Sequence, residues 1–404
     1  MVTTRADAEA LDAADPLGAV RDRFTLPDGV IYLDGNSLGA MPKSTPDRLA
    51  HAIRHEWGER LIRSWNEADW WHASRRVAQG LAPLLGATPD ELAVADSTSV
   101  NLFKLLAAGL RMRQGRSVLV AERYAFPTDV YIARSVAELF GAQVRLIDEP
   151  DELPAVLDER VAVVCLSHVD FRTGAMWPAA RTTALAHRAG ALMLWDLCHA
   201  TGAVDVDLRG WCADLAVGCG YKYLNGGPGA PSYMFVAAEH QPGLRTPLPG
   251  WHGHADPFAM SPEYRPATGI GQLANGTPPV LSLLALEDAV NALSGVSTAD
   301  LRAKSVALTG LFIDLVTNRC SGVEVVTPVD ADRRGSQVSL RLGHAYALVR
   351  ALIERGVIGD FRAPDIARFG FAPAYSRYVD VWDAVESIVE LLTSGDHLTD
   401  RFAA

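Results

Sequence analysis

Short runs of apolar and β-branched residues alternate with longer amphipathic stretches through the middle of the chain. The runs typical of buried strands cover residues 117–122, 143–148, 161–167, 191–196, 214–219 and 232–237. Between these runs, residues 127–142 and 178–190 carry apolar side chains at helical spacing. Strands that are apolar on both faces and separated by helices predict an α/β fold, with a mostly parallel sheet covered by helices on both sides.

The pattern changes after the last of these strands. Residues 241–280 are rich in proline and glycine and show little periodicity, and a helix is predicted to begin near Val280. The C-terminal part has the pattern of a smaller α+β unit that ends on an amphipathic helix. We therefore expect an N-terminal segment (1–50) that packs with the small domain, a large domain (51–280) and a small C-terminal domain (281–404).

Composition and charge narrow the classes of partner. The 404 residues carry a formal net charge of −11, which argues against a nucleic-acid partner because phosphate backbones attract clustered Lys and Arg. The sequence has no apolar run of about 18 residues and starts with a polar, alanine-rich stretch, so neither a membrane span nor a secretory signal is expected. Five scattered cysteines without a CxxC pair predict a reduced, cytoplasmic protein without a metal site.

Two residues that follow strands form the strongest chemical signal. Asp196 ends the run 191–196, and Lys222 stands just past the run 214–219, in the stretch GCGYKYLNGGPG. Because parallel strands end at one edge of a sheet, an anion and a primary amine are brought to the same place. A carboxylate that faces a protonated ring nitrogen and a lysine that forms a Schiff base together indicate a pyridoxal 5′-phosphate (PLP) site.

The other parts of such a site stand at suitable positions in the sequence. Thr98 and Ser99 open an amphipathic helix in DSTSVNLFKLLAAGL, where hydroxyls and free N–H groups can hold a phosphate. Phe126, after the run 117–122, is placed to cover one face of the pyridine ring, and Tyr221 to bond the phosphate or relay a proton. Singly, each residue has an ordinary explanation as a cap, a turn residue or a core side chain. Their order and their places at strand ends favour the cofactor site.

Several longer motifs give the chain a specific resemblance. They are YLDGNSLGAMP (32–42), LSHVDFRTG (166–174), WDLCHATGAVDVDL (195–208), GWHGHADPFAM (250–260), NGTPP (275–279) and RFGFAPAY (368–375). Through these and the lysine stretch, the sequence resembles the kynureninase family over nearly its whole length. That family comprises fold-type I PLP enzymes related to the class V aminotransferases. The resemblance implies a PLP-dependent transferase-like fold and PLP as the cofactor.

The resemblance also implies roles for individual residues. Lys222 would carry the cofactor as an imine, and Asp196 would partner the pyridine nitrogen. The remaining positions matched to cofactor contacts are Thr98, Ser99, Phe126, Asp129, Ser167, His199 and Tyr221. Trp251 and Thr277 match residues that reach the cofactor phosphate from the neighbouring subunit, which implies a homodimer. Some family members have Asn where Thr277 stands, so the contact there is polar but not identical.

Substrate contacts are matched less completely. Arg368 matches the arginine that grips the α-carboxylate of the substrate bidentately, and Ser37, after DGN, is expected near the substrate. The motifs do not identify the residues that read the aromatic ring of the substrate. The stretch WNEADWWH (65–72) either lines that pocket or packs against the large domain.

The resemblance implies PLP-dependent hydrolysis of L-kynurenine, and of 3-hydroxykynurenine, to anthranilate or 3-hydroxyanthranilate and L-alanine, in tryptophan catabolism or NAD synthesis. Lys222 would take the Cα proton, and Tyr221 would donate or relay a proton in later steps. Three alternatives stay open: a cysteine desulfurase-like or transaminating PLP enzyme, a kynureninase variant acting on a substituted kynurenine in secondary metabolism, and a catalytically silent binding protein. A desulfurase needs a reactive cysteine on a mobile loop, and the one candidate beyond the cofactor domain, Cys320, is interpreted as structural.

Overall fold

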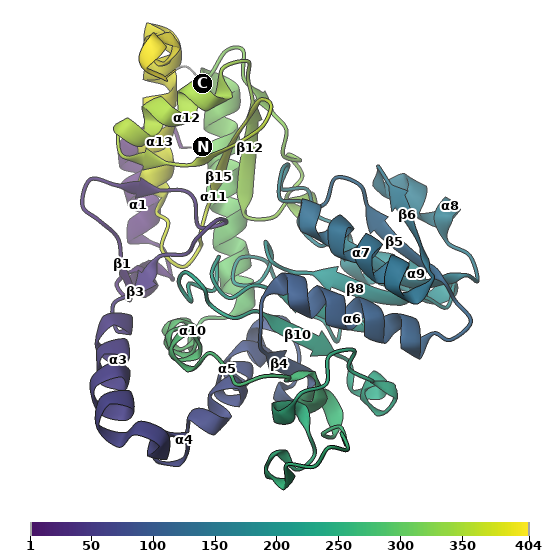
Figure 1. The fold of residues 1–404 in the computed structure, drawn as a ribbon. Coiled ribbons are helices and arrows are strands. Elements are labelled where there is room, and N and C mark those ends of the chain that lie inside the picture. The colour runs from purple at the N-terminus through teal and green to yellow at the C-terminus, as the bar shows by residue number, and fades with distance from the viewer. Residues whose placement is uncertain (1, 403–404) are drawn as a thin grey trace.

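The computed structural model describes residues 2–402 and has a seven-stranded sheet at its centre (Figure 1). The strand order is β4-β10-β9-β8-β7-β5-β6. The strands are β4 Leu92–Val94, β5 Val118–Glu122, β6 Gln143–Ile147, β7 Val161–Ser167, β8 Leu192–Asp196, β9 Leu215–Gly218 and β10 Tyr233–Val236. Strands β5 to β9 are mutually parallel, and β10 runs antiparallel to β9 and β4. The mostly parallel sheet and all six expected strands are confirmed.

Helices cover both faces of this sheet because successive strand residues point to opposite sides. On β8, Leu192 and Leu194 share a core with two helices, α6 (Thr98–Met112) and α7 (Pro127–Phe140). Met193 and Trp195 belong to a second core. The helices of that second core are α5 (Ala73–Leu81), α9 (Ala179–Arg188) and α10 (Val280–Ala292). The two cores explain why the central strands are apolar on both faces.

The C-terminal part of the chain forms an antiparallel sheet in the order β11-β12-β15-β14. Its strands are β11 Glu324–Val325, β12 Gln337–Arg341, β14 Asp360–Arg362 and β15 Ile366–Gly370. Helices α11 (Thr298–Arg319) and α12 (Ala345–Glu354) pack on it, and α13 (Tyr378–Ser394) packs on these two helices. A third core, which includes Phe312, Phe369 and Phe371, joins these elements.

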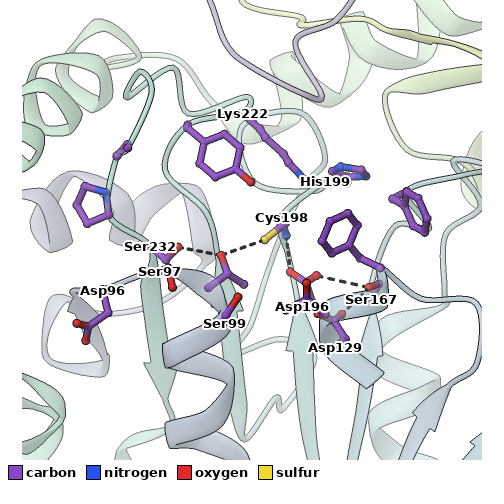
Figure 2. Close-up of a pocket in the computed structure, with 18 of the residues that line it drawn as sticks. Asp96, Ser97, Ser99, Asp129, Ser167, Asp196, Cys198, His199, Lys222 and Ser232 are labelled. Carbon is purple, nitrogen blue, oxygen red and sulfur yellow. Dashed lines mark hydrogen bonds between the residues drawn. The ribbon is translucent and has the colours of Figure 1, made fainter. Parts of the chain in front are cut away.

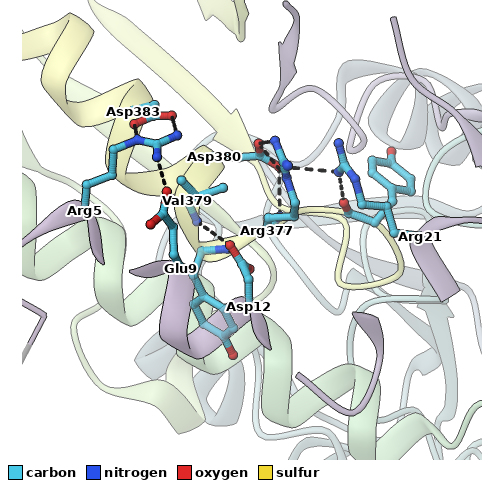
Figure 3. Close-up of polar contacts among 10 residues, drawn as sticks. Arg5, Glu9, Asp12, Arg21, Arg377, Val379, Asp380 and Asp383 are labelled. Carbon is cyan, nitrogen blue, oxygen red and sulfur yellow. Dashed lines mark hydrogen bonds and ion pairs between the residues drawn. The ribbon is translucent and has the colours of Figure 1, made fainter. Parts of the chain in front are cut away.

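The N-terminal helix α1 (Arg5–Ala13) lies along α13 (Figure 3). Arg5 Nε donates to Asp383 Oδ1 at 2.7 Å, and the Asp12 carboxylate accepts the N–H groups of Tyr378 and Val379 at 2.7 and 2.9 Å. Asp12 thereby satisfies free N–H groups at the start of α13, where an anion also suits the helix dipole. These contacts hold the two ends of the chain together.

Short elements connect the N-terminal helix to the rest. Strand β2 (Ile31–Tyr32) pairs with β13 (Val357–Ile358), and Asp34 forms a bridge with Gly370. The motif that carries Ser37 therefore runs beside β15. The remaining short elements are α2 Gly18–Arg21, β1 Phe24–Thr25, β3 Met41–Pro42, α3 Thr45–His51, α4 Ser64–Glu67 and α8 Leu153–Val156.

Two stretches lack ordinary helices or strands. A π-helical segment covers Ala52–Arg60, and the proline- and glycine-rich stretch 241–280 holds only 3₁₀ turns before α10 begins at Val280, as the sequence predicts. Within residues 2–402, no helix combines the length and the apolar character that a membrane crossing requires.

Candidate active site

A cavity of about 410 Å³ opens at the carboxyl ends of the central strands (Figure 2). Ser167 ends β7 and Asp196 ends β8, and the two residues are partners in the parallel register. Lys222 follows shortly after β9, the other neighbour of β8. The predicted convergence of the anion and the amine on one sheet edge is therefore present.

The wall of this cavity contains most of the predicted site residues. The sequence-predicted members are Thr98, Ser99, Phe126, Asp129, Ser167, Asp196, His199, Tyr221 and Lys222. The other members of the wall are Asp96, Ser97, Thr128, Val169, Phe171, Cys198, Gly229, Ala230, Pro231, Ser232 and Pro279. Trp251, Thr277, Arg368 and Ser37 lie elsewhere, as described below.

Two buried carboxylates lie together at the floor of the cavity. Asp196 Oδ1 accepts the Cys198 N–H at 2.8 Å, and the Ser167 hydroxyl lies 3.4 Å from Asp129 Oδ2 and 3.5 Å from Asp196 Oδ2. Burial, and then the Asp196 carboxylate, raise the pKa of Asp129 well above its usual value. Within the described residues, no ion pair links either carboxylate to a basic side chain. Buried anions are normally paired, so this floor is suited to a cationic ligand atom.

Lys222 lies in a tight turn whose backbone is held by hydrogen bonds from two other residues. The Gly39 N–H donates to Tyr221 O at 2.8 Å, and the Asn225 N–H donates to Lys222 O at 2.9 Å. A Cβ on Gly39 would lie 2.2 Å from Lys222 O, so only glycine allows this approach. Lys222 Nζ lies 6.0 Å from the centroid of the Phe126 ring and 5.9 Å from that of Tyr221. The amine thus points into the cavity from a fixed backbone.

The opposite end of the cavity is the start of helix α6. Ser97 caps the helix by accepting the Val100 N–H at 3.5 Å, and Thr98 and Ser99 are its first residues. The Thr98 hydroxyl lies 2.8 Å from the hydroxyl of Ser232, which is also on the wall. Free N–H groups, two hydroxyls and the positive end of the helix dipole suit a phosphate group.

His199 is a neutral, partly unsatisfied group on the wall. It is buried, and its Nδ1 has no hydrogen-bond partner among the described residues. Burial, and then the nearby Lys222, lower the pKa of His199 well below its usual value. Tyr221 is shifted in the other direction, because burial raises its pKa. Both side chains therefore face the cavity uncharged at neutral pH.

Arg368 does not line the cavity wall but forms a buried cluster behind Phe171. Arg368 Nε donates to Asp360 Oδ1 at 2.8 Å, and Nη2 donates to the other Asp360 oxygen and, at 3.0 Å, to the Ser37 hydroxyl. Nη1 donates to Phe171 O at 2.5 Å, and the Arg368 side chain is only 1% exposed. Ser37 and Arg368 are thus together, and Asp360 is a partner that the sequence reasoning missed.

The register of one hairpin could have revealed Asp360. Strands β14 and β15 pair antiparallel with Asp360 directly opposite Arg368. In the sequence DFRAPDIARFG, a hairpin closed around the proline places these residues as a cross-strand pair, and opposite charges favour that pairing.

Trp251 and Thr277 lie outside the cavity of their own chain. Trp251 is 37% exposed, and its ring centroid lies 5.8 Å from that of Trp71. Thr277 lines a separate space of about 40 Å³. The stretch 65–72 does not reach the cavity wall either: Trp70 is buried, with its Nε1 donating to Glu56 Oε2 at 2.7 Å. That Trp251 and Thr277 serve a neighbouring subunit stays a prediction.

The residues present fit PLP. The unpaired buried Asp196 suits a protonated pyridine nitrogen, the start of α6 suits the phosphate, and the half-exposed Phe126 ring offers a face for stacking. Among residues 2–402, Lys222 is the only lysine on the wall of this cavity. The orphaned Nδ1 of His199 leaves a further polar contact for a ligand.

Comparisons with known proteins point to one family. Residues 301–388 match the family described as the kynureninase C-terminal domain. A curated kynureninase from Burkholderia mallei (strain ATCC 23344) is 50% identical over 408 residues, covering 99% of this chain and 98% of that protein. The kynureninase of Pseudomonas fluorescens is 49% identical over 399 residues, covering 97% of this chain and 96% of that protein.

Solved structures show the same fold at lower identity. The cysteine desulfurase CsdA of Escherichia coli superimposes with a TM-score of 0.78 at 20% identity, covering 98% of this chain and 100% of that one. A mutant of C-DES with glycine covalently linked to its PLP cofactor gives 0.81 at 17% identity, covering 92% and 99%. At these identities the likeness concerns the fold, which confirms the expected fold-type I architecture. The curated relatives are about 50% identical over almost the whole length of the chain, and this decides the family. The chain belongs to the kynureninase family.

Proposed function

We propose that this protein hydrolyses L-kynurenine, and 3-hydroxykynurenine, to anthranilate or 3-hydroxyanthranilate and L-alanine with PLP as its cofactor. The observation that carries the proposal is the identity of about half of all positions to curated kynureninases over 99% of the chain. The cavity adds independent support, because its lysine, buried carboxylates and helix start are the groups that a PLP enzyme requires.

The cofactor would be held by groups that the fold has already fixed. Thr98 and Ser99 would bind its phosphate, Asp196 would hold the proton of its ring nitrogen, and Phe126 would cover one ring face. When bound, PLP supplies an electron sink for the charge that develops at the substrate Cα. The polar Ser167 hydroxyl between the two carboxylates would keep Asp196 oriented.

Proton transfer would fall to the side chains on the opposite wall. Lys222 Nζ, aimed into the cavity from its fixed turn, would take the Cα proton of the substrate. Tyr221 is placed directly beside it, and the raised pKa of its hydroxyl keeps the proton available for donation in later steps. The neutral His199 would contribute a hydrogen bond rather than a charge.

The substrate carboxylate would be read by the cluster around Arg368. Asp360 and Ser37 fix the guanidinium in one plane, so the Nη edge faces a defined direction. Phe171 O accepts from Nη1 and belongs to the cavity wall, which connects the cluster to the reaction space. Four of the five guanidinium N–H groups are already engaged, so a bidentate contact with the substrate carboxylate would replace the bond to Ser37 or to Phe171 O.

Steady-state kinetics with L-kynurenine and 3-hydroxykynurenine, followed by the fluorescence of the anthranilate product, test the proposal. Cysteine serves as the rival substrate, with sulfide as the readout, because the structural neighbours include desulfurases. The structure argues against that alternative: Cys320 is buried, and burial raises its pKa to about 11, whereas a desulfurase needs an exposed, reactive thiol. Sulfide release without anthranilate formation would refute the proposal, and a Lys222→Ala variant should show neither product.

We also propose a cytoplasmic homodimer that serves tryptophan catabolism or NAD synthesis. Trp251 and Thr277 lie away from their own cavity, which supports a role in the site of a second copy. Light scattering on the purified protein tests the dimer, and a Trp251→Ala variant with weakened PLP binding would support the shared site. A monomer with full activity would contradict it.

A further inference from the structure

A buried lysine on helix α6 lies behind the phosphate end of the cavity. The Lys104 side chain is fully buried, and its Nζ donates to Asp96 Oδ2 at 2.5 Å, Leu273 O at 2.6 Å and Asn275 Oδ1 at 3.1 Å. Burying an ammonium group is costly unless its protons are bonded, and these three acceptors satisfy all three protons. Burial lowers the pKa of Lys104, and the Asp96 carboxylate opposes that shift.

Asp96 connects this lysine to the cavity. It belongs to the cavity wall and precedes the helix cap Ser97, and its backbone has a φ of +50°, which is uncommon for a residue other than glycine. Its carbonyl accepts the Ser232 N–H at 2.9 Å. Figure 2 shows Asp96 at the end of the cavity where Ser97 and Ser99 lie. Its position is therefore fixed by the sheet on one side and by Lys104 on the other.

A carboxylate is an unfavourable neighbour for a phosphate dianion. The repulsion between two anions grows where burial lowers the effective dielectric constant, and the Asp96 side chain is only 28% exposed. Lys104 cancels this charge, and no other basic side chain of residues 2–402 forms an ion pair with Asp96. The bonds to the Leu273 carbonyl and the Asn275 side chain keep the ammonium in place, because they anchor it to a separate segment of the chain.

We propose that Lys104 is a positioning residue for the cofactor phosphate, which acts by neutralising Asp96 at the start of helix α6. The proposal rests on the proposed function only in placing the phosphate of PLP at Thr98 and Ser99. In this role Lys104 affects phosphate binding through Asp96 and does not contact the cofactor itself.

The test compares two ligands that differ by the phosphate alone. PLP and pyridoxal are titrated into the full-length apoprotein, prepared by removing the cofactor from the purified enzyme, and binding is followed by absorbance and tryptophan fluorescence. We expect Lys104→Met to weaken PLP binding at least about tenfold and pyridoxal binding less than about twofold. Adding Asp96→Asn to that variant should restore PLP binding to within about threefold of wild type, because it removes the uncompensated anion.

A second buried pair provides the matched control. Lys304 lies 2.6 Å from Asp15, with both side chains 4% exposed, and neither residue lines the cavity. Lys304→Met should therefore leave the ratio of PLP to pyridoxal affinity unchanged. Should Lys104→Met not fold, Asp96→Asn alone decides the matter, since removal of the anion should strengthen PLP binding relative to pyridoxal binding.

Two results would overturn the proposal. One is equal weakening of PLP and pyridoxal by Lys104→Met without rescue by Asp96→Asn, which would reduce Lys104 to a packing role. The other is an Asp96→Asn variant that loses affinity for PLP alone. Both results are read from affinity ratios, so they are distinct from a failure of the proposed function, in which the wild-type protein would not convert kynurenine.

Discussion

The carboxyl group of Asp34 provides a quantitative test of the charge balance around Arg368. Burial raises the pKa of Asp34 to about 7 from its usual 3.8, the Asp360 carboxylate acts in the same direction, and Ser37 and Arg368 oppose the shift. The folded protein thus keeps the proton up to about pH 7, whereas the unfolded chain loses it near pH 3.8. The contribution of protonated Asp34 to the free energy of unfolding is therefore fully present below pH 3.8 and is lost as the pH rises toward 7.

The size of this loss follows from the shift. One pKa unit corresponds to about 1.4 kcal/mol, so the free energy of unfolding falls by at most about 4 kcal/mol between the two pKa values. An unfolding entropy of about 2.1 cal/mol/K per residue gives about 0.85 kcal/mol/K for a chain of 404 residues. The loss then corresponds to a melting temperature lowered by about 5 °C at most, and solvent screening reduces this to about 2–4 °C.

An Asp34→Asn variant cannot ionise and should escape the loss. In differential scanning calorimetry at pH values from 5 to 8, the melting temperature of the variant should rise relative to that of the wild type up to about pH 7. Above that pH, the difference between the two melting temperatures should stay constant. Asp28→Asn, at an exposed position, serves as the control and should show no such trend. A difference between Asp34→Asn and wild type that stays constant from pH 5 to pH 7, or reverses sign, would refute the reasoning.

Three further substitutions test other parts of the site. Gly39→Ala should lower kcat by about tenfold or more, because its Cβ would meet Lys222 O at 2.2 Å and displace the lysine turn; kinetics on kynurenine measure this. Asp360→Ala should lower the free energy of unfolding by about 3–5 kcal/mol in a urea titration, because it leaves the buried Arg368 unpaired, and Asp360→Asn should cost less. Cys320→Ala should keep kynurenine turnover within about twofold, whereas a large loss would contradict the structural role assigned to this buried thiol.

The large sheet was predictable because its central strands are buried on both faces. Six runs of apolar residues each exceed the length at which a buried strand can be recognised, and all six form strands. Strand β4 escaped prediction because it has only three residues, of which Ala93 carries little pattern. The division of the chain into units at residues 50 and 280 remains a prediction. Helix α10, just past the second boundary, packs on α5 and α3.

The site was predictable where a strand end fixes the position of a side chain. Asp196 and Ser167 end neighbouring strands, so their proximity follows from the topology alone. Ser232 was missed because its partner Thr98 stands far away in the sequence, and only the packing of the chain brings the two together. Asp360 was missed although Arg368 is close in the sequence, because their pairing depends on the register of the β14–β15 hairpin. Periodicity reports the face on which a residue lies, and it does not report which distant residue faces it.

The cluster around Arg368 has a charge that depends on one proton. Below pH 7, where Asp34 is protonated, the cations Arg368 and Arg362 outnumber the single anion Asp360, so the cluster attracts a carboxylate. Above pH 7 the ionised Asp34 makes the cluster neutral, and the attraction weakens. The KM for kynurenine should therefore rise above pH 7 in the wild type and stay level in Asp34→Asn, while kcat is unaffected by the substitution. An equal rise of KM in both proteins would place the titrating group on the substrate or elsewhere in the site, and would separate Asp34 from substrate binding.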